Sequence, residues 1–130
     1  MLIFGHRFIP SERFYHIDDI EAILHTPSNS LLYLSFDERN LDIITHLNTN
    51  AIRFALETGS IRDVIYAENL GASFIILNAD MAKSAQKIAE NYLFNAKILV
   101  HVQDESQIEA MAYEGIDGVI FSDAFVKITS

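Results

Sequence analysis

The sequence predicts an α/β fold built on a mainly parallel sheet, and three observations lead to it. Five short apolar runs of strand length recur at steps of 21 to 24 residues. A polar capping residue and a helical pattern follow each of the first four runs. Strands that alternate with helices pair in parallel through right-handed crossovers. The five runs are Leu31–Phe36, Ile52–Glu57, Ser73–Asn78, Lys97–Val102 and Gly118–Phe121.

The first thirty residues are less regular than the rest of the chain. Leu2–Phe4 and Phe14–Ile17 are short apolar stretches that we expect to be strands. The segment Asp18–His25 is predicted to be a short helix that is capped by Asp18 or Asp19. Residues 26–30 contain proline, asparagine and serine, which indicates a loop before the first regular strand.

Helix starts and ends are marked along the regular part of the chain. Gly71 and Gly115 stand where a helix commonly ends in a left-handed residue. Two strands, Phe74–Leu77 and Ile98–Val100, are apolar at every position, so we expect them in the centre of a sheet that is covered on both faces. The expected helix caps are Asp37, Ser60, Asp80 and Asp104.

Composition limits the class of protein. The whole chain, residues 1–130, is expected to form a single α/β domain, because its length suits one core and 50% of it is hydrophobic. No cysteine is present, which excludes disulfides and thiolate metal sites. The net charge of −9 argues against nucleic acid as a partner. Without a long apolar run or signal-peptide pattern, the expected location is cytoplasmic, with no membrane contact.

Two sheet architectures fit these elements. A complete (βα)₈ barrel needs at least about 200 residues, so this chain cannot close one alone. The favoured architecture is an open, doubly wound sheet of five or six strands, flavodoxin-like in shape. The alternative is a half (βα) barrel that completes itself by dimerising. On a small open sheet, the apolar segment Tyr92–Phe94 at the end of the longest helix predicts a homodimer contact.

Both architectures bind ligands at the carboxyl ends of the strands. A glycine and a serine at a helix start can point N–H groups at a phosphate, so a small anionic ligand is expected near residues 57–60. The expected ligand-binding residues are Glu57, Thr58, Gly59, Ser60 and Ser122.

Other residues at these strand ends are candidates for chemistry. His101 ends a central strand, where an imidazole can act as an acid or base near neutral pH. Asp80 and Asp123 are candidate metal ligands, although helix capping explains such carboxylates as well. No dinucleotide-binding or P-loop glycine motif occurs, so we expect no cofactor.

Two segments of the chain resemble glycerophosphodiester phosphodiesterases. Residues 98–102, followed by Gly115–Phe121, are similar to the last two βα units of these phosphate-binding barrels. Phe4-Gly5-His6-Arg7 resembles the His-Arg pair that ends their first strand. In that family the pair serves the phosphodiester beside metal-binding acids. The resemblance therefore implies His6 and Arg7 as candidate catalytic residues.

The sequence supports two functional hypotheses. The leading one is a non-catalytic α/β module, of a bacterial family, that binds a small molecule or a partner protein. The alternative is a metal-dependent phosphodiesterase or phosphoryl-processing enzyme. Such an enzyme needs the His6–Arg7 pair and at least two further strand-end residues around one cavity. Those further candidates are Glu57, Asp80, His101 and Asp123.

Overall fold

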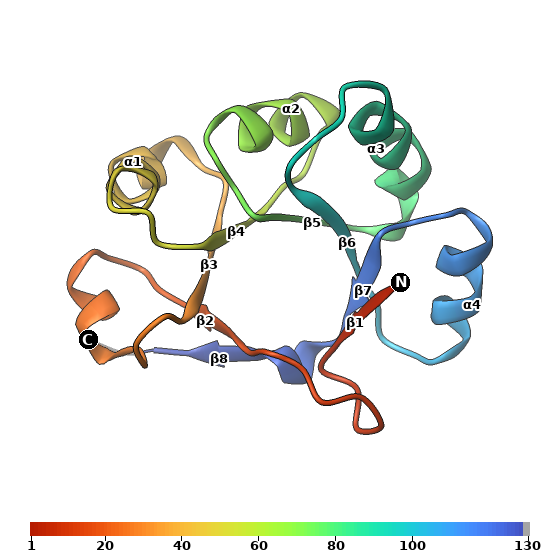
Figure 1. Cartoon of the computed structure of the whole chain (residues 1–130), viewed down its shortest axis with the longest axis horizontal. Helices are drawn as coiled ribbons and strands as arrows, with labels where there is room; N and C mark the ends of the chain where they lie inside the picture. The colour runs from red at the N-terminus through yellow and green to blue at the C-terminus, as the bar shows by residue number, and fades with distance from the viewer. Residues whose placement is uncertain (129–130) are drawn as a thin grey trace.

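The computed structural model describes residues 1–128 as one curled sheet of eight parallel strands. The sheet forms a half-barrel, and helices α1–α4 lie on its convex side (Figure 1). The strand order across the sheet is β1-β7-β6-β5-β4-β3-β2-β8. The strands are β1 (Leu2–Phe4), β2 (Phe14–His16), β3 (Leu31–Ser35), β4 (Phe54–Glu57), β5 (Phe74–Leu77), β6 (Lys97–His101), β7 (Gly118–Ile120) and β8 (Phe125–Lys127). The α-helices are α1 (Leu41–Thr49), α2 (Ile61–Asn69), α3 (Ala79–Asn91) and α4 (Ser106–Tyr113), and the 3₁₀ helices are η1 (Glu21–His25), η2 (Glu38–Asn40) and η3 (Ser122–Ala124).

The α/β class and the parallel pairing are confirmed, and the half-barrel alternative is the architecture that fits. The expected doubly wound, flavodoxin-like sheet of five or six strands is wrong. A doubly wound sheet reverses its strand order at a switch point and carries helices on both faces. Here β2 to β7 are neighbours in chain order, so every right-handed crossover places its helix on the same side. With helices on one side only, the sheet curls around its other face (Figure 1).

The curled sheet separates two apolar clusters. The outer cluster packs alternate strand residues against the helices, as Leu56 and Ile75 pack against α1–α3 residues such as Leu47. The inner cluster consists of side chains from the strands and η3, without an α-helix. Phe4, Phe14 and Phe74 of this inner cluster meet with ring centroids 5.0 to 5.6 Å apart. The concave side is therefore filled by the chain's own aromatic rings.

The last strand does not follow its predecessor in the sheet. Strand β7 pairs with β1 at one edge of the sheet, whereas β8, which starts five residues after β7 ends, pairs with β2 at the other edge. Helix η3 makes this crossing over the carboxyl end of β1, where the Phe121 N–H donates to the Phe4 carbonyl at 2.9 Å. The backbone of η3 passes directly against Gly5, which has a φ of +81°.

Two of the four expected caps, Asp37 and Ser60, occupy the N-cap of a helix, whereas Glu105 rather than Asp104 holds that position in α4. Ser60 caps α2, because its Oγ accepts a hydrogen bond from the Asp63 N–H at 3.1 Å. Asp80 is not a cap, since α3 begins at Ala79 and leaves Asp80 in the first turn. There its charge still lies at the positive end of the helix dipole. Within residues 1–128, no helix combines the length and apolar character needed to cross a membrane.

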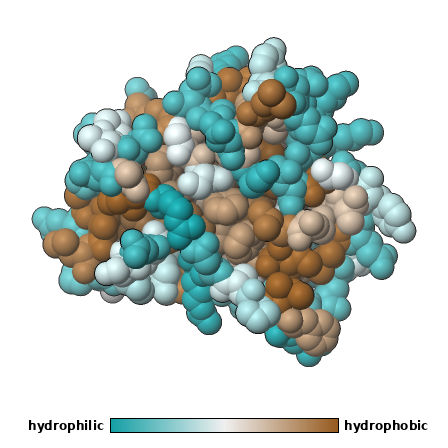
Figure 2. All heavy atoms as spheres, in the orientation of Figure 1, coloured by the Kyte–Doolittle hydropathy of each residue, from teal (hydrophilic) through white to brown (hydrophobic). Residues whose placement is uncertain are grey.

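The convex side near β1 and β8 carries no α-helix within the described residues (Figure 1). Figure 2 shows apolar side chains at the lower right edge of this view, where Figure 1 places the loop between β1 and β2. Phe8 and Ile9 of this loop are 68% and 43% exposed. Two exposed apolar side chains therefore lie in the loop that follows β1.

Candidate functional site

A cavity of about 370 Å³ opens at the carboxyl ends of β1, β6 and β7. Parallel barrels place their active sites at this end of the strands, and the volume lies in the usual range for small-molecule sites. Three segments distant in sequence form it: the turn after β1, the loop between β6 and α4, and the start of η3. The lining residues are Gly5, His6, Arg7, Val102, Gln103, Asp104, Glu105, Phe121, Ser122 and Asp123.

His6 is fixed in the wall of this cavity by hydrogen bonds at both ring nitrogens. The Phe8 N–H donates to Nδ1 at 3.1 Å, so the ring proton lies on Nε2. Nε2 then donates to the Glu105 carboxylate at 2.9 Å. The rings of Phe8 and Phe121 pack edge-on against the imidazole, with centroids 5.0 and 5.3 Å away. The structure thus holds His6 in one tautomer and one orientation.

A second cavity of about 350 Å³ shares a wall with the first. Four residues line both cavities: Gly5, His6, Arg7 and Asp123. The remaining wall comes from the β1–β2 loop, where Arg13 is exposed and Glu12 is bound by Arg53 at 2.6 Å. The two cavities therefore form one polar depression with the His-Arg segment in its middle.

Some charged side chains around this depression have a partner and others have none within the described residues. The Arg7 guanidinium lies 4.6 Å from the centre of the Phe8 ring, and no carboxylate in residues 1–128 forms an ion pair with it. Asp123 likewise has no hydrogen bond or ion pair with any residue that the structure describes. The Asp104 carboxylate accepts hydrogen bonds from the N–H and the hydroxyl of Ser106, and the hydroxyl in particular lowers the pKa of this carboxyl.

His101 and Ser122 meet at the inner rim of the first cavity. His101 Nε2 and Ser122 Oγ are hydrogen-bonded at 3.0 Å. The His101 ring also packs edge-on against Phe125 of β8, with centroids 5.4 Å apart. His101 thus reaches the cavity through Ser122, whose side chain lines it.

Tyr33 and Glu57 form a neighbouring pair inside the half-barrel. The Tyr33 hydroxyl donates to the Glu57 carboxylate, and the Tyr33 ring packs 4.6 Å from that of Phe125. Burial first, and then the hydrogen bond and charge of Glu57, raise the pKa of Tyr33 well above its ordinary range. The Phe125 ring packs against both Tyr33 and His101, so it contacts a member of each pair.

The expected anion cradle at residues 58–60 lies apart from the cavity. Thr58 is buried, and both its N–H and its hydroxyl donate to the Ile76 carbonyl, at 2.8 and 3.2 Å. Ser60 uses its hydroxyl oxygen to cap α2. Gly59 is exposed, with open space where a Cβ would lie. These three residues have structural partners or face solvent, and anion binding there stays a prediction.

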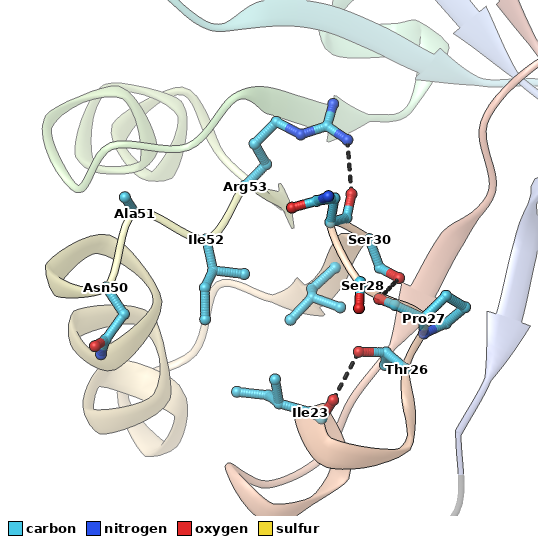
Figure 3. Close-up of a pocket in the computed structure, with 11 residues that line it drawn as sticks. Ile23, Thr26, Pro27, Ser28, Ser30, Asn50, Ala51, Ile52 and Arg53 are labelled. Carbon is cyan, nitrogen blue, oxygen red and sulfur yellow. Dashed lines mark hydrogen bonds between the residues drawn. The ribbon is translucent and has the colours of Figure 1, made fainter.

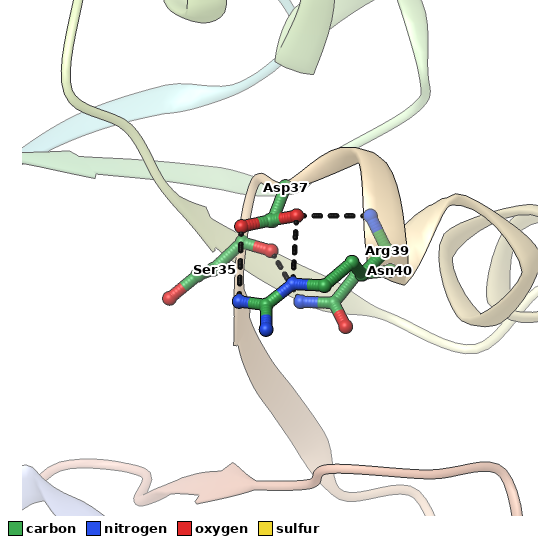
Figure 4. A network of polar contacts seen from close by, with 4 residues as sticks. All are labelled: Ser35, Asp37, Arg39 and Asn40. Carbon is green, nitrogen blue, oxygen red and sulfur yellow. Dashed lines mark hydrogen bonds and ion pairs between the residues drawn. The ribbon is translucent and has the colours of Figure 1, made fainter.

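A third cavity, of about 490 Å³, lies at the carboxyl ends of β2 and β3. The Asp37 carboxylate at its edge accepts hydrogen bonds from the N–H and the guanidinium of Arg39, at 2.9 to 3.2 Å (Figure 4). The Arg39 side chain in turn lowers the pKa of the Asp37 carboxyl. Asn40 donates to the Ser35 carbonyl at 2.8 Å. The charges of Asp37 and Arg39 are paired with each other, so this network fixes the loop after β3.

A further cavity, of about 410 Å³, lies at the opposite, amino end of β3 and β4 (Figure 3). Its charged residue, Arg53, donates to the Asn29 carbonyl at 3.2 Å and is paired with Glu12. In barrels this face serves stability rather than catalysis. The cavity therefore ranks below the one beside His6.

Two residues of these sites, Glu105 and Tyr33, are not among the candidate site residues predicted from the sequence. Glu105 follows β6 by four residues, and its partner His6 lies 99 positions away. No spacing rule connects such distant residues. The Tyr33–Glu57 contact was easier to predict, because the two residues lie on neighbouring strands. The register of these strands places Tyr33 opposite Ala55 and Ser35 opposite Glu57.

The metal candidates are not brought together. Asp80 lies at the start of α3, whereas Asp123 lies at the start of η3 beside the first cavity. Residues 1–128 contain no group of three histidine or acidic side chains arranged to hold a metal ion. Comparison with protein-family models and with curated protein sequences gives no match to this chain.

Proposed function

We propose that this chain is a non-catalytic module that binds a small molecule in the cavity beside His6. The observation that carries the proposal is the convergence of three distant segments on one ligand-sized cavity at the carboxyl ends of the strands. Arg7 and Asp123 line it without an ion-pair partner in the described part of the chain. Their charges are therefore available to a ligand.

The fixed state of His6 supports binding over catalysis. A general base must offer a ring nitrogen to the substrate. Here Nδ1 accepts from the Phe8 N–H and Nε2 donates to Glu105, so both nitrogens are engaged. His6 acts as a brace that joins the β1 end to the β6–α4 loop and so holds two walls of the cavity in place.

The alternative, a metal-dependent phosphodiesterase, has less support. It needs His6, Arg7 and at least two of four further candidates around one cavity. Of those four, Asp123 lines that cavity with them, whereas His101 is not a lining residue and only forms a hydrogen bond with Ser122, which is one. The other two candidates, Glu57 and Asp80, are not among the lining residues. Asp104, Glu105 and Asp123 line this cavity, but no three histidine or acidic side chains among residues 1–128 are arranged to hold a metal ion.

A ligand screen by thermal shift, followed by amide chemical-shift mapping, tests the proposal. The screen should contain neutral, cationic, anionic and zwitterionic metabolites. We expect at least one compound to raise Tm in a saturable way and to shift amides of residues 5–7, 102–105 and 121–123.

A cavity-filling variant gives the control. Gln103→Trp places a large ring in the cavity and should abolish binding, while Lys83→Trp on the exposed side of α3 should leave it unchanged. Binding that survives Gln103→Trp, or a screen without any saturable ligand, would overturn the proposed function.

A further inference from the structure

The geometry points to the class of ligand: a small zwitterion that carries an ammonium group and a carboxylate, as a free α-amino acid does. This inference rests on the proposed binding function of the same depression. It follows from how the charged side chains are distributed over the two adjoining cavities, and from which of them already have partners.

Positive charge lies toward the β1–β2 loop. Arg7 lines both cavities, and Arg13 lines the second one. Neither guanidinium forms an ion pair within residues 1–128. The carboxylate nearest in sequence, Glu12, is bound by Arg53 through two hydrogen bonds of 3.1 and 2.6 Å. A guanidinium prefers a planar, bidentate acceptor, which a carboxylate supplies.

Negative charge lies toward the β6–α4 loop and η3. Asp104, Glu105 and Asp123 line the first cavity. Glu105 receives one hydrogen bond from His6, which leaves acceptor capacity on its carboxylate, and Asp123 has no partner within the described residues. An ammonium group can donate three hydrogen bonds, and these carboxylates provide the acceptors.

A ligand with a single charge fits this arrangement poorly. Arg7 and Asp123 line the same wall, yet they do not form an ion pair with each other. A bound anion would face Asp123 and the loop acids, while a bound cation would face Arg7. A zwitterion presents its carboxylate to the arginine side and its ammonium to the acidic side, so both charges find an opposite partner.

The test is titration of the protein with the common α-amino acids, followed by NMR of backbone amides and by calorimetry. For the amino acid that binds best, the methyl ester lacks the anion and the N-acetyl derivative lacks the cation. We expect each derivative to bind at least about tenfold more weakly, since a charge-assisted contact is lost. Arg7→Gln and Asp123→Asn should each cause a similar loss.

Matched variants of the same chemistry serve as controls. Arg62→Gln and Asp80→Asn change exposed charges on α2 and α3 and should leave binding within twofold. The inference is overturned if no amino acid binds or if the ester and N-acetyl compounds bind equally well. Should a neutral or singly charged compound bind in the cavity while amino acids do not, the inference fails and the proposed function stands. If no compound binds, both fail.

Discussion

Gly5 and Ala124 are in closer contact than any other residue type at position 5 would permit. A Cβ built on Gly5 would lie 2.7 Å from the Ala124 backbone nitrogen and 2.9 Å from the Phe121 carbonyl oxygen. Both atoms belong to the segment that carries the chain from β7 across the end of β1 to β8. Gly5 therefore permits the crossing, and it also precedes the His-Arg segment of the cavity.

Gly5→Ala should destabilise the protein by more than about 2 kcal/mol. The new Cβ meets backbone atoms that cannot rotate away, and the φ of +81° adds a conformational penalty. Gly115→Ala is the control, because Gly115 has a φ of +73° but no atom within 4 Å of its Cβ position. It should cost about 1 kcal/mol. Denaturant unfolding measures both, and equal losses would show that the crossing is not tight.

Ile75→Ala should cost about 2–5 kcal/mol, because Ile75 is 0% exposed between β4 and β6 and packs in the outer cluster. Ile65→Ala on the exposed side of α2 is the control and should cost much less, since Ile65 is 41% exposed. Chemical denaturation gives both values. A loss below about 1 kcal/mol for Ile75→Ala would contradict its place in the core.

Tyr33 should ionise later than the other tyrosines in an alkaline titration followed by tyrosinate absorbance. Burial and the Glu57 carboxylate raise its pKa in the folded protein, whereas the unfolded chain ionises near pH 10. The stabilising contribution is therefore complete below pH 10 and is lost as pH rises above it. Tyr33→Phe should remove the late step and flatten this alkaline loss of stability. A titration in which all five tyrosines ionise together would contradict the prediction.

Millimolar Mg²⁺, Mn²⁺ or Ca²⁺ should raise Tm no more than sodium chloride of equal ionic strength. Asp80 and Asp123 lie on separate elements, and no three acidic or histidine side chains among residues 1–128 are arranged to hold a hard cation. Specific binding at a hundred times Kd would add about 2.7 kcal/mol of stability. A saturable, ion-specific rise that Asp123→Asn abolishes would instead favour the phosphodiesterase hypothesis.

The chain should form a homodimer through the surface after α3. Tyr92 and Leu93 are 76% and 85% exposed there, whereas the concave side is already filled by the inner cluster. Screening to about 8 Å at physiological salt limits the repulsion from the net charge of −9. Sedimentation should give about twice the 14.7 kDa chain mass. Leu93→Glu should shift the protein toward monomer, and a monomeric native protein at micromolar concentration would refute the dimer.

The secondary structure was largely predictable because polar capping residues mark where the apolar runs end. Each of the five predicted runs contains a strand that is shorter by one or two residues, as Lys97–Val102 contains β6 and Leu31–Phe36 contains β3. The short strand β8 was missed, since Phe125–Lys127 has neither the length nor the alternation that marks a strand.

The strand order was not predictable, because periodicity says that a helix follows a strand but not on which face it packs. All four α-helices pack on the same face of the sheet, and this makes it a half-barrel rather than a doubly wound sheet. Of the site, the phosphodiesterase resemblance named His6 and Arg7, and the strand-end rule placed Asp123 at the correct edge of the sheet. It could not show that Glu105 braces His6, which depends on the curl of the sheet.

The pairing of β8 with β2 also has a consequence for how the protein folds during synthesis. Phe14 lies opposite Phe125, 111 positions later in the chain. Until the ribosome has released β8, the edge of β2 has no partner there, and the inner cluster lacks the Phe125 ring that packs against Phe14. Contacts of such long range slow folding, and an unpaired apolar edge invites misassembly. Nascent chains that stop before β8 are therefore the forms of this protein most in need of a chaperone.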